Sequence, residues 1–325
     1  NTTIAATNFE RKGVNARIVF MGTPEFAVAS LAALVDAGYN VVGVITAPDK
    51  PAGRGMKLQQ SAVKKYAEEK GLHILQPEKL KNPQFLAELK SLNADIQIVV
   101  AFRMLPEVVW NMPPLGTVNV HGSLLPQYRG AAPINWAIIN GEKETGVTTF
   151  KLKQEIDTGN ILLQESIAIG ENETAGELHD RMKEAGAGLL VKTLQGLNGG
   201  SLEELSQEVI TSSETSPKEL KHAPKIFTDT CKIDWNKPVA GIYNLIRGLS
   251  PYPGAFTLLN GKTIKIYRGD KETGAVTCES GEFVTDKKSF LKFACPDGYI
   301  SVKELQTEGK KRMGIEEFLR GYRFE

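Results

Sequence analysis

Cysteine is scarce in this sequence, and its few copies are not spaced to form a framework. The 325 residues include three cysteines, Cys231, Cys278 and Cys295, with no CxxC pair among them. An odd number without such pairing argues against a disulfide scaffold and against a zinc site. The four histidines are also scattered, without an i,i+4 pair. The sequence therefore predicts no metal centre.

Long apolar runs are missing as well. No stretch approaches the ~20 uninterrupted apolar residues that a membrane helix requires. Residues 1–16 lack the apolar core of a signal peptide, so we expect them to be a loose N-terminal extension. These absences predict a cytoplasmic protein with no membrane association. No obligate protein partner is evident, so we expect a monomer.

Neither sign of charge dominates the chain, whose net charge is +1. The distribution is nevertheless uneven. Residues 1–216 carry 20 Lys and Arg against 24 Asp and Glu, whereas residues 217–325 carry 19 against 14. A mildly basic C-terminal part attached to a mildly acidic N-terminal part indicates a polyanionic partner, although simple solvation of the extra charges is the alternative.

Strand and helix patterns alternate over the first part of the chain. Buried-strand runs lie at 17–22, 41–46 and 94–102, and helical patterns lie at 23–38 and 61–71. This alternation predicts an α/β fold with a Rossmann-like, doubly wound and mostly parallel sheet. No G-x-G-x-x-G motif follows the first strand, so we do not expect a dinucleotide site.

Local signals also mark where these elements begin and end. In the first helix, Thr23 is placed to cap the N-terminus, Pro24 to occupy the first position and Gly38 to end the helix. Such signals predict boundaries, whereas the alternation of patterns predicts the fold class.

A second, smaller domain is expected after a polar connection. The segment 207–222 is rich in Ser, Thr and Glu and is interpreted as a linker. Beyond it, short alternating stretches broken by turn residues such as Asn260-Gly261 predict a small OB-like β-barrel over 223–325. The sequence thus predicts an N-terminal domain over 17–206, a linker and a β-domain.

An amide and an imidazole stand two residues apart at the end of an apolar run. They belong to TVNVHGSLLPQYRGAAPINW, at 117–136. TVNVH is a short predicted strand, in which the two-residue period places Asn119 and His121 on the same face. Ligands bind open α/β sheets at the carboxyl ends of the strands, so this pair is a candidate site. The alternative is a structural turn with a satisfied core histidine.

A carboxylate follows in EIDTGNILLQ, at 155–164. There Asp157 is expected at the tip of a tight turn, for which a plain structural turn is the alternative. An amide, an imidazole and a carboxylate suit an amine attacking a carbonyl, because the amide stabilises the oxyanion and the imidazole moves the proton. The carboxylate would fix the tautomer of the imidazole and organise a water. No Ser or Cys is placed as a necessary nucleophile, which favours direct acyl transfer.

The motifs that carry these residues resemble a known family. NVHGSLLPQYRGAAPINW, followed by ETGVTTF and DTGNILL, is similar to the formyltetrahydrofolate-dependent transferase family. FMGTPEFA, PDKPAGRG and the C-terminal PKIFTDTCKIDWNKPVAGIYNLIRGLSPYPGAF resemble the members that act on methionyl-tRNA. The resemblance, which spans residues 17–325, implies 10-formyltetrahydrofolate as the donor. It implies the α-amino group of methionine on initiator tRNA as the acceptor.

The resemblance also implies roles for individual residues. Asn119 would stabilise the oxyanion, His121 would act as acid and base, and Asp157 would support His121. Folate contacts are implied for Ser123, Leu124, Leu125 and Pro126, and pterin contacts for Phe102, Arg103 and Met104. The pterin stretch departs from the family pattern, because Ala-Phe-Arg-Met-Leu-Pro stands at 101–106 where Ala-Tyr-Gly-x-Ile-Leu-Pro is common.

Contacts to tRNA are implied for two further regions. In the family, the loop that matches 47–60 reaches the acceptor stem, which implicates Arg54 and Lys57. The basic C-terminal domain is expected to contact the tRNA backbone, with Lys225 and Arg247 among the candidates. Three alternatives stay open: a formyltransferase for glycinamide ribonucleotide or an amino sugar, a hydrolase that releases formate from the same donor, and a tRNA- or folate-binding module without activity.

Overall fold

The computed structural model describes residues 15–55, 57–213 and 219–324, so most of the expected N-terminal extension and part of the expected linker lie outside the described residues. The chain divides into two compact units. The first unit is made of Asn1–Arg129, Gly146–Ile167 and Asp180–Lys221, and the second of Gly130–Thr145, Ala168–His179 and His222–Glu325. Each unit is described by itself below.

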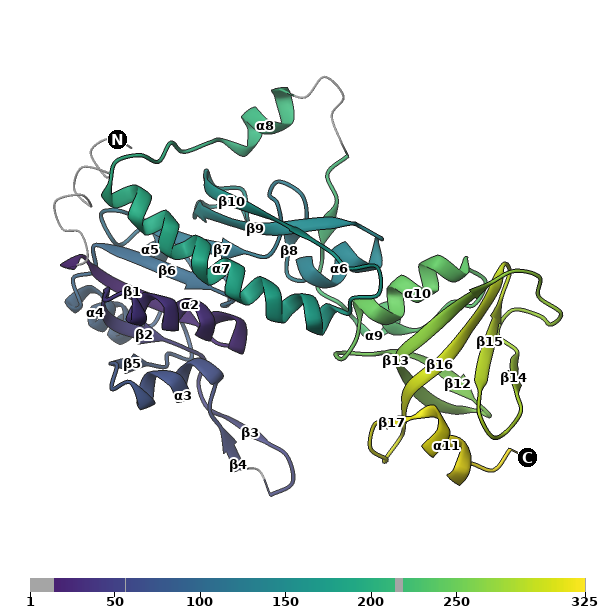
Figure 1. The fold of residues 1–325 in the computed structure, drawn as a ribbon. Coiled ribbons are helices and arrows are strands. Elements are labelled where there is room, and N and C mark those ends of the chain that lie inside the picture. The colour runs from purple at the N-terminus through teal and green to yellow at the C-terminus, as the bar shows by residue number, and fades with distance from the viewer. Residues whose placement is uncertain (1–14, 56, 214–218, 325) are drawn as a thin grey trace. The chain divides into compact units, whose positions relative to one another are not determined.

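A seven-stranded sheet forms the centre of the first unit (Figure 1). Its order is β10-β9-β7-β6-β1-β2-β5. The strands are β1 (Arg17–Gly22), β2 (Asn40–Ile45), β5 (Ile74–Leu75), β6 (Ile96–Val100), β7 (Thr117–His121), β9 (Glu144–Lys151) and β10 (Ile161–Ala168). The five strands from β7 to β5 pair in parallel, and β9 runs antiparallel to β7. The predicted mostly parallel sheet is confirmed.

Helices cover both faces of this sheet. They are α2 (Glu25–Asp36), α3 (Ala62–Glu69), α4 (Pro83–Ser91), α5 (Glu107–Trp110), α7 (Ala175–Asn198) and α8 (Gln207–Ser213). Val19 and Met21 of β1 pack in one core cluster with Phe85 of α4. Ile18 and Phe20, which are equally buried, face the other side because side chains alternate along a strand. The sheet is thus doubly wound.

The first turns of α2 and α3 differ in whether a side chain accepts a hydrogen bond from their free backbone amides. The N-cap of α2 is Pro24, with no side-chain cap, so the expected capping by Thr23 is wrong. Ser61 does cap α3, because its hydroxyl accepts a hydrogen bond from the Lys64 amide at 3.0 Å. The carbonyl of Thr23 instead accepts from the Val63 amide at 3.2 Å, which ties the start of α2 to the first turn of α3.

The second unit is built on an antiparallel sheet that curls into a half-barrel (Figure 1). Its strands are β12 (Ala255–Leu259), β13 (Lys262–Thr273), β14 (Phe283–Thr285), β15 (Leu291–Cys295), β16 (Gly298–Thr307) and β17 (Met313–Gly314). The predicted Asn260-Gly261 turn joins β12 to β13, with both residues at positive φ. Trp235 stacks on Phe293 at a ring separation of 4.8 Å inside the sheet's core.

The remaining elements are short apart from one helix. They are α6 (Pro133–Ile139), α9 (Thr228–Cys231), α10 (Val239–Gly248), α11 (Ile315–Gly321), β8 (Arg129–Gly130) and β11 (His222–Ala223). The helix α10 packs its buried face on β13 and β16 of the curled sheet. The three cysteines are free thiols, and burial raises the pKa of Cys295 to about 11.

Candidate active site

The candidate site begins at the carboxyl end of β7. This strand is flanked by β6, parallel to it, and by β9, antiparallel to it. Asn119 and His121 lie two residues apart on β7 and share one face, as the strand period requires. The Asn119 side chain is half-buried and makes no hydrogen bond within the described part of the chain. Its amide donors are therefore available to a ligand.

His121 is held from two sides. Its Nε2 lies 2.8 Å from the carbonyl oxygen of Tyr128, and its ring meets the ring of Phe150 edge-on at 6.5 Å. A carbonyl can only accept, so Nε2 carries the proton of this bond. In the neutral ring, Nδ1 is then the basic nitrogen. The Tyr128 carbonyl, rather than Asp157, sets the tautomer.

Asp157 faces the basic nitrogen. Its Oδ2 lies 3.8 Å from His121 Nδ1, and both side chains are largely buried. This separation is too long for a hydrogen bond, but it places a carboxylate directly in front of Nδ1. The structure therefore brings together two of the three residues that the sequence nominated, 36 positions apart in the chain.

The turn that carries Asp157 sits tightly against β9. A Cβ at Gly159 would overlap the Lys151 carbonyl oxygen, so only glycine permits this approach. Asp157 itself adopts a φ of 55°, a left-handed conformation that Asp tolerates better than most residues. The backbone around the carboxylate is thus specified by packing as well as by hydrogen bonds.

The turn at Ser123–Pro126 is held from within the first unit. The Ser123 hydroxyl donates to the Gln127 carbonyl at 2.6 Å, and the Ser123 carbonyl accepts from the Thr148 hydroxyl at 2.6 Å. The Gln164 amide donates to the Leu125 carbonyl at 2.8 Å. Ser123, Leu125 and Pro126 are buried, whereas Leu124 is half-buried. The turn is therefore a rigid surface whose accessible part is Leu124.

The residues expected around the pterin differ in exposure. Met104 is 69% exposed, and Phe102 packs partly buried against the core cluster that contains α4. The Arg103 guanidinium lies over the Phe102 ring at 5.2 Å and donates to the carbonyls of Pro77 and Glu78. Burial lowers the pKa of Arg103. These two hydrogen bonds tie the segment 101–106 to the loop after β5.

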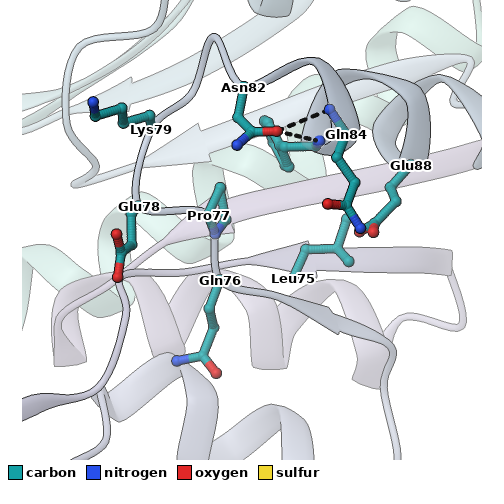
Figure 2. A pocket seen from close by; sticks show the side chains of 9 residues that line it. Leu75, Gln76, Pro77, Glu78, Lys79, Asn82, Gln84 and Glu88 are labelled. Atoms are coloured by element: carbon teal, nitrogen blue, oxygen red, sulfur yellow. Dashed lines mark hydrogen bonds between the residues drawn. The ribbon is translucent and has the colours of Figure 1, made fainter.

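That loop forms the wall of a pocket of about 360 Å³ (Figure 2). Its lining residues are Leu75, Gln76, Pro77, Glu78, Lys79, Asn82, Gln84, Phe85 and Glu88. Figure 2 shows Asn82 at one side of the pocket. Its side-chain oxygen Oδ1 caps α4 by accepting a hydrogen bond from the backbone amide of Gln84 at 2.8 Å. Pro77 and Glu78, which line the pocket, also accept the hydrogen bonds from Arg103 of the segment 101–106.

The segment 47–60, expected as a polar loop, contains a β-hairpin. Its strands are β3 (Lys50–Ala52) and β4 (Lys57–Gln59), which pair antiparallel. We call residues 50–59 the arm; Met56 lies outside the described residues. Gly53 and Gly55, on either side of Arg54, have φ of 76° and 84°, which glycine adopts without strain. Arg54 and Lys57 are exposed.

The base of the arm is anchored by Asp49. Its carboxylate accepts from Lys64 Nζ at 2.8 Å and from Gln76 Nε2 at 2.8 Å. Gln76 also donates to the Ala47 carbonyl at 3.0 Å. The hydrogen bond from Lys64, together with that from Gln76, holds the pKa of Asp49 below its ordinary value. The arm thus projects from a charged, hydrogen-bonded base.

The two tRNA candidates of the second unit lie in different environments. Lys225 is exposed, and its ammonium lies 5.8 Å from the ring centre of Phe227, which is itself 63% exposed. Arg247 is buried, and it donates to the Glu173 carbonyl at 3.0 Å and to Asn244 at 2.9 Å. Burial lowers its pKa. This placement favours a structural role for Arg247.

Two family models match the chain. The model described as formyl transferase covers residues 16–194, and the one described as formyl transferase, C-terminal domain, covers residues 225–323. The chain belongs to the formyl transferase family. The family match thus includes the strand that carries Asn119 and His121 and the turn that carries Asp157.

Curated relatives of this family are similar over almost their whole length. A protein of Bacteroides fragilis named methionyl-tRNA formyltransferase is 53% identical over 311 residues, covering 94% of this chain and 95% of the relative. A protein of the same name from Parabacteroides distasonis is 56% identical over 313 residues, covering 94% and 96%.

Solved structures show the same fold at low sequence identity. The N-formyltransferase of Helicobacter canadensis, in complex with folinic acid and dTDP-3-aminofucose, matches with a TM-score of 0.66 at 22% identity, covering 90% of this chain and 99% of that one. HypX of Aquifex aeolicus, in complex with tetrahydrofolic acid, matches with a TM-score of 0.63 at 17% identity, covering 94% and 48%.

The described residues also bear on metals and membranes. Among residues 15–55, 57–213 and 219–324, no group of three or more His, Cys, Asp or Glu side chains is arranged to hold a metal ion. No helix in the part of the chain that the structure describes has the length and apolar character needed to cross a membrane.

Several supporting residues of this formyl transferase site were missed by the sequence analysis. The carbonyl of Tyr128 orients His121, and Thr148 and Gln164 hold the turn at Ser123–Pro126. Tyr128 acts through its backbone, which any residue type supplies. Thr148 and Gln164 lie in ordinary strand sequences, so no local signal singles them out.

The Asp49 anchor predicts a pH dependence at the base of the arm. Because its pKa is lowered, the anchored carboxylate stabilises the fold above the ordinary Asp pKa of about 3.9, and this contribution is lost as the pH falls through the lowered value. Carboxyl NMR titration should find the pKa of Asp49 below about 3.9. Lys64→Met should raise this pKa toward that value, because it removes the charged hydrogen-bond donor. Lys65→Met, at an exposed neighbour, is the control. An ordinary pKa in the unsubstituted protein would refute the anchor.

Proposed function

We propose that this formyl transferase moves the formyl group of 10-formyltetrahydrofolate to the α-amino group of methionine on initiator tRNA. The observation that carries the proposal is the 50–56% identity, over nearly the whole chain, to relatives named methionyl-tRNA formyltransferase. The placement of an amide, an imidazole and a carboxylate at one sheet edge supports it. In this proposal the enzyme works in the cytoplasm as a monomer.

The proposed reaction is a direct attack through a tetrahedral intermediate. The methionine amine forms a bond to the formyl carbon, and the carbonyl oxygen becomes an oxyanion. Asn119 donates a hydrogen bond to that oxygen, which strengthens as charge develops there. His121 Nδ1 takes the proton that the attacking nitrogen must lose, and Asp157 stabilises the resulting imidazolium. The proton then passes to N10 of the folate as its bond to the formyl carbon breaks.

Binding of the two substrates is assigned to different surfaces. The turn at Ser123–Pro126 and the stretch Phe102–Met104 contact the folate, with Arg103 supporting that stretch through its carbonyl contacts rather than meeting the pterin. Arg54 and Lys57 of the arm meet the acceptor stem, and Lys225 contributes from the second unit. In domain terms, we propose a catalytic domain over 17–206, a connection over 207–222 and a tRNA-binding domain over 223–325.

Two rival activities keep the same donor. An amino-sugar formyltransferase shares this fold, yet solved examples are 19–22% identical to this chain, far below the methionyl-tRNA enzymes. A formate-releasing hydrolase would place water where the amine attacks. Neither has an observation of this structure in its favour.

The assay that tests the function uses both substrates at once. Purified protein, 10-formyltetrahydrofolate and charged initiator tRNA should produce formyl-methionyl-tRNA with little free formate. Charged elongator methionyl-tRNA and a dTDP-amino sugar are the comparison acceptors. Formate release that is independent of the tRNA would identify a hydrolase, and preference for the sugar would identify the other rival.

The assignment of Asn119 and His121 predicts losses of turnover without losses of fold. Asn119→Ala should lower kcat by roughly 10²–10³-fold, the usual cost of one oxyanion donor. His121→Ala should lower kcat by roughly 10²–10⁴-fold, because the general base is lost. The matched controls, Asn111→Ala and His73→Ala, lie at exposed positions and should keep full turnover. Near-normal kcat at saturating substrates in either test variant would disprove its role.

Arg54 of the arm predicts a defect that is specific to tRNA. Its planar guanidinium suits a phosphate or a base edge, and the same contact would place the methionine near His121. Arg54→Ala should lower kcat/KM for charged initiator tRNA by about tenfold or more. Arg54→Lys should recover only part of this kcat/KM, because an ammonium group cannot reproduce the paired, planar donors of a guanidinium. Folate affinity should be unchanged, and Lys65→Ala serves as the control. Normal formylation by Arg54→Ala would leave the arm a surface hairpin.

A further inference from the structure

The segment between the two family-matched spans contains a buried polar side chain. The models end at residue 194 and resume at residue 225, and the sequence predicts a linker over 207–222. The first residue of α8, Gln207, is nevertheless only 1% exposed. A side chain that carries both a donor and an acceptor is buried only where partners satisfy it.

Those partners belong to the turn that carries Asp157. Gln207 Nε2 donates to the carbonyl of Asp157 at 2.8 Å and to the carbonyl of Gly159 at 2.8 Å. Gln207 Oε1 accepts from Arg129 Nη2 at 2.7 Å and from Arg129 Nε at 3.1 Å. Arg129 Nε also lies 3.3 Å from the Asp157 carbonyl. Gln207 and Arg129 together hold the backbone on which the Asp157 carboxylate is mounted.

The same segment continues this attachment through its backbone. Just before α8, Leu205 and Ile161 exchange two hydrogen bonds, at 2.8 and 2.9 Å. These bonds join the segment to β10 at a residue four positions beyond Asp157. The side chain of Gln207 is therefore presented to the turn from a fixed backbone rather than from a free tether.

The far end of the segment supports the histidine. The Lys221 carbonyl accepts from the Tyr128 amide at 2.7 Å, and the Lys221 amide donates to Gln127 Oε1 at 2.9 Å. Tyr128 is the residue whose carbonyl fixes the His121 ring. Residues at both ends of the connection thus hold the two loops that face each other across the 3.8 Å gap between His121 Nδ1 and Asp157 Oδ2.

We propose that Gln207 is a positioning residue for formyl transfer, and that Leu205, Gln207 and Lys221 belong to the catalytic apparatus rather than to a passive linker. Gln207 acts through the backbone of Asp157 and Gly159 and sets the position of the carboxylate relative to His121. The proposal rests on the proposed roles of Asp157 and His121. Glutamine suits this place because it offers donors to two carbonyls and an acceptor to Arg129 without adding charge.

The test is Gln207→Glu, which keeps the length of the side chain and the acceptor for Arg129 but removes both donors. Steady-state kinetics with 10-formyltetrahydrofolate and charged initiator tRNA should show kcat lowered about ten- to a hundredfold, as expected when a reacting group moves by about 1 Å. KM for both substrates should stay within about twofold. Gln207→Ala is the second variant, and Gln195→Glu, at an exposed position of α7, is the matched control.

A double-mutant cycle with Asp157→Asn decides whether Gln207 acts through Asp157. If it does, the double variant should be as slow as Asp157→Asn alone, because the positioned group is already lost. Losses that multiply would overturn the proposal and leave Gln207 a general stabiliser. Normal kcat in both Gln207 variants, with Asp157→Asn impaired, would overturn the positioning role alone. Full activity of Asp157→Asn would instead overturn the proposed role of Asp157.

Discussion

The chemistry of the site depends on one hydrogen bond, from His121 Nε2 to the carbonyl of Tyr128. That bond places the ring proton on the side away from Asp157. The neutral ring then offers Nδ1 as a base in front of the carboxylate, at 3.8 Å. The other tautomer, with the ring proton on Nδ1, would present an N–H to the carboxylate instead, and Nδ1 could no longer accept a proton. A backbone carbonyl suits this task because it can never donate.

The arrangement around that bond is rigid through many contacts rather than through one strong contact. Each neighbouring loop is held through backbone carbonyls that accept from side chains: Gln207 and Arg129 on the Asp157 turn, and Thr148 and Gln164 on the Ser123–Pro126 turn. A buried carbonyl that loses its partner costs about 1–3 kcal/mol. Several such bonds in one place therefore make displaced conformations of the loops rare, although each bond by itself contributes little.

Local pattern predicted part of this molecule, and contacts between distant segments decide the rest. The strand periods identified β1, β6 and β7, and the two-residue alternation placed Asn119 and His121 on one face. The meeting of His121 with Asp157 joins residues 36 positions apart; the chemistry of the residue types and the family resemblance indicated it, but no local pattern did. Gln207 stands in a polar stretch whose composition favours a linker, and its burial follows from carbonyls on another loop. The expected Thr23 cap was wrong, because the N-cap position of α2 falls on Pro24, which has no side chain that can accept a hydrogen bond.

The loops around His121 and the tip of the arm are built differently. The loops around His121 are bonded from several directions, which suits the proposed reaction because proton transfer tolerates little displacement of the reacting groups. In the arm, two glycines at positive φ flank the exposed Arg54. A Cβ atom at either glycine would meet no atom of the described residues within 4 Å. If the arm meets tRNA as proposed, an exposed cation between two glycines suits a macromolecular substrate that arrives with its own shape. Asp49 holds the base of the arm through its hydrogen bonds to Lys64 and Gln76, so the direction of the arm is set below the Gly-Arg-Gly turn.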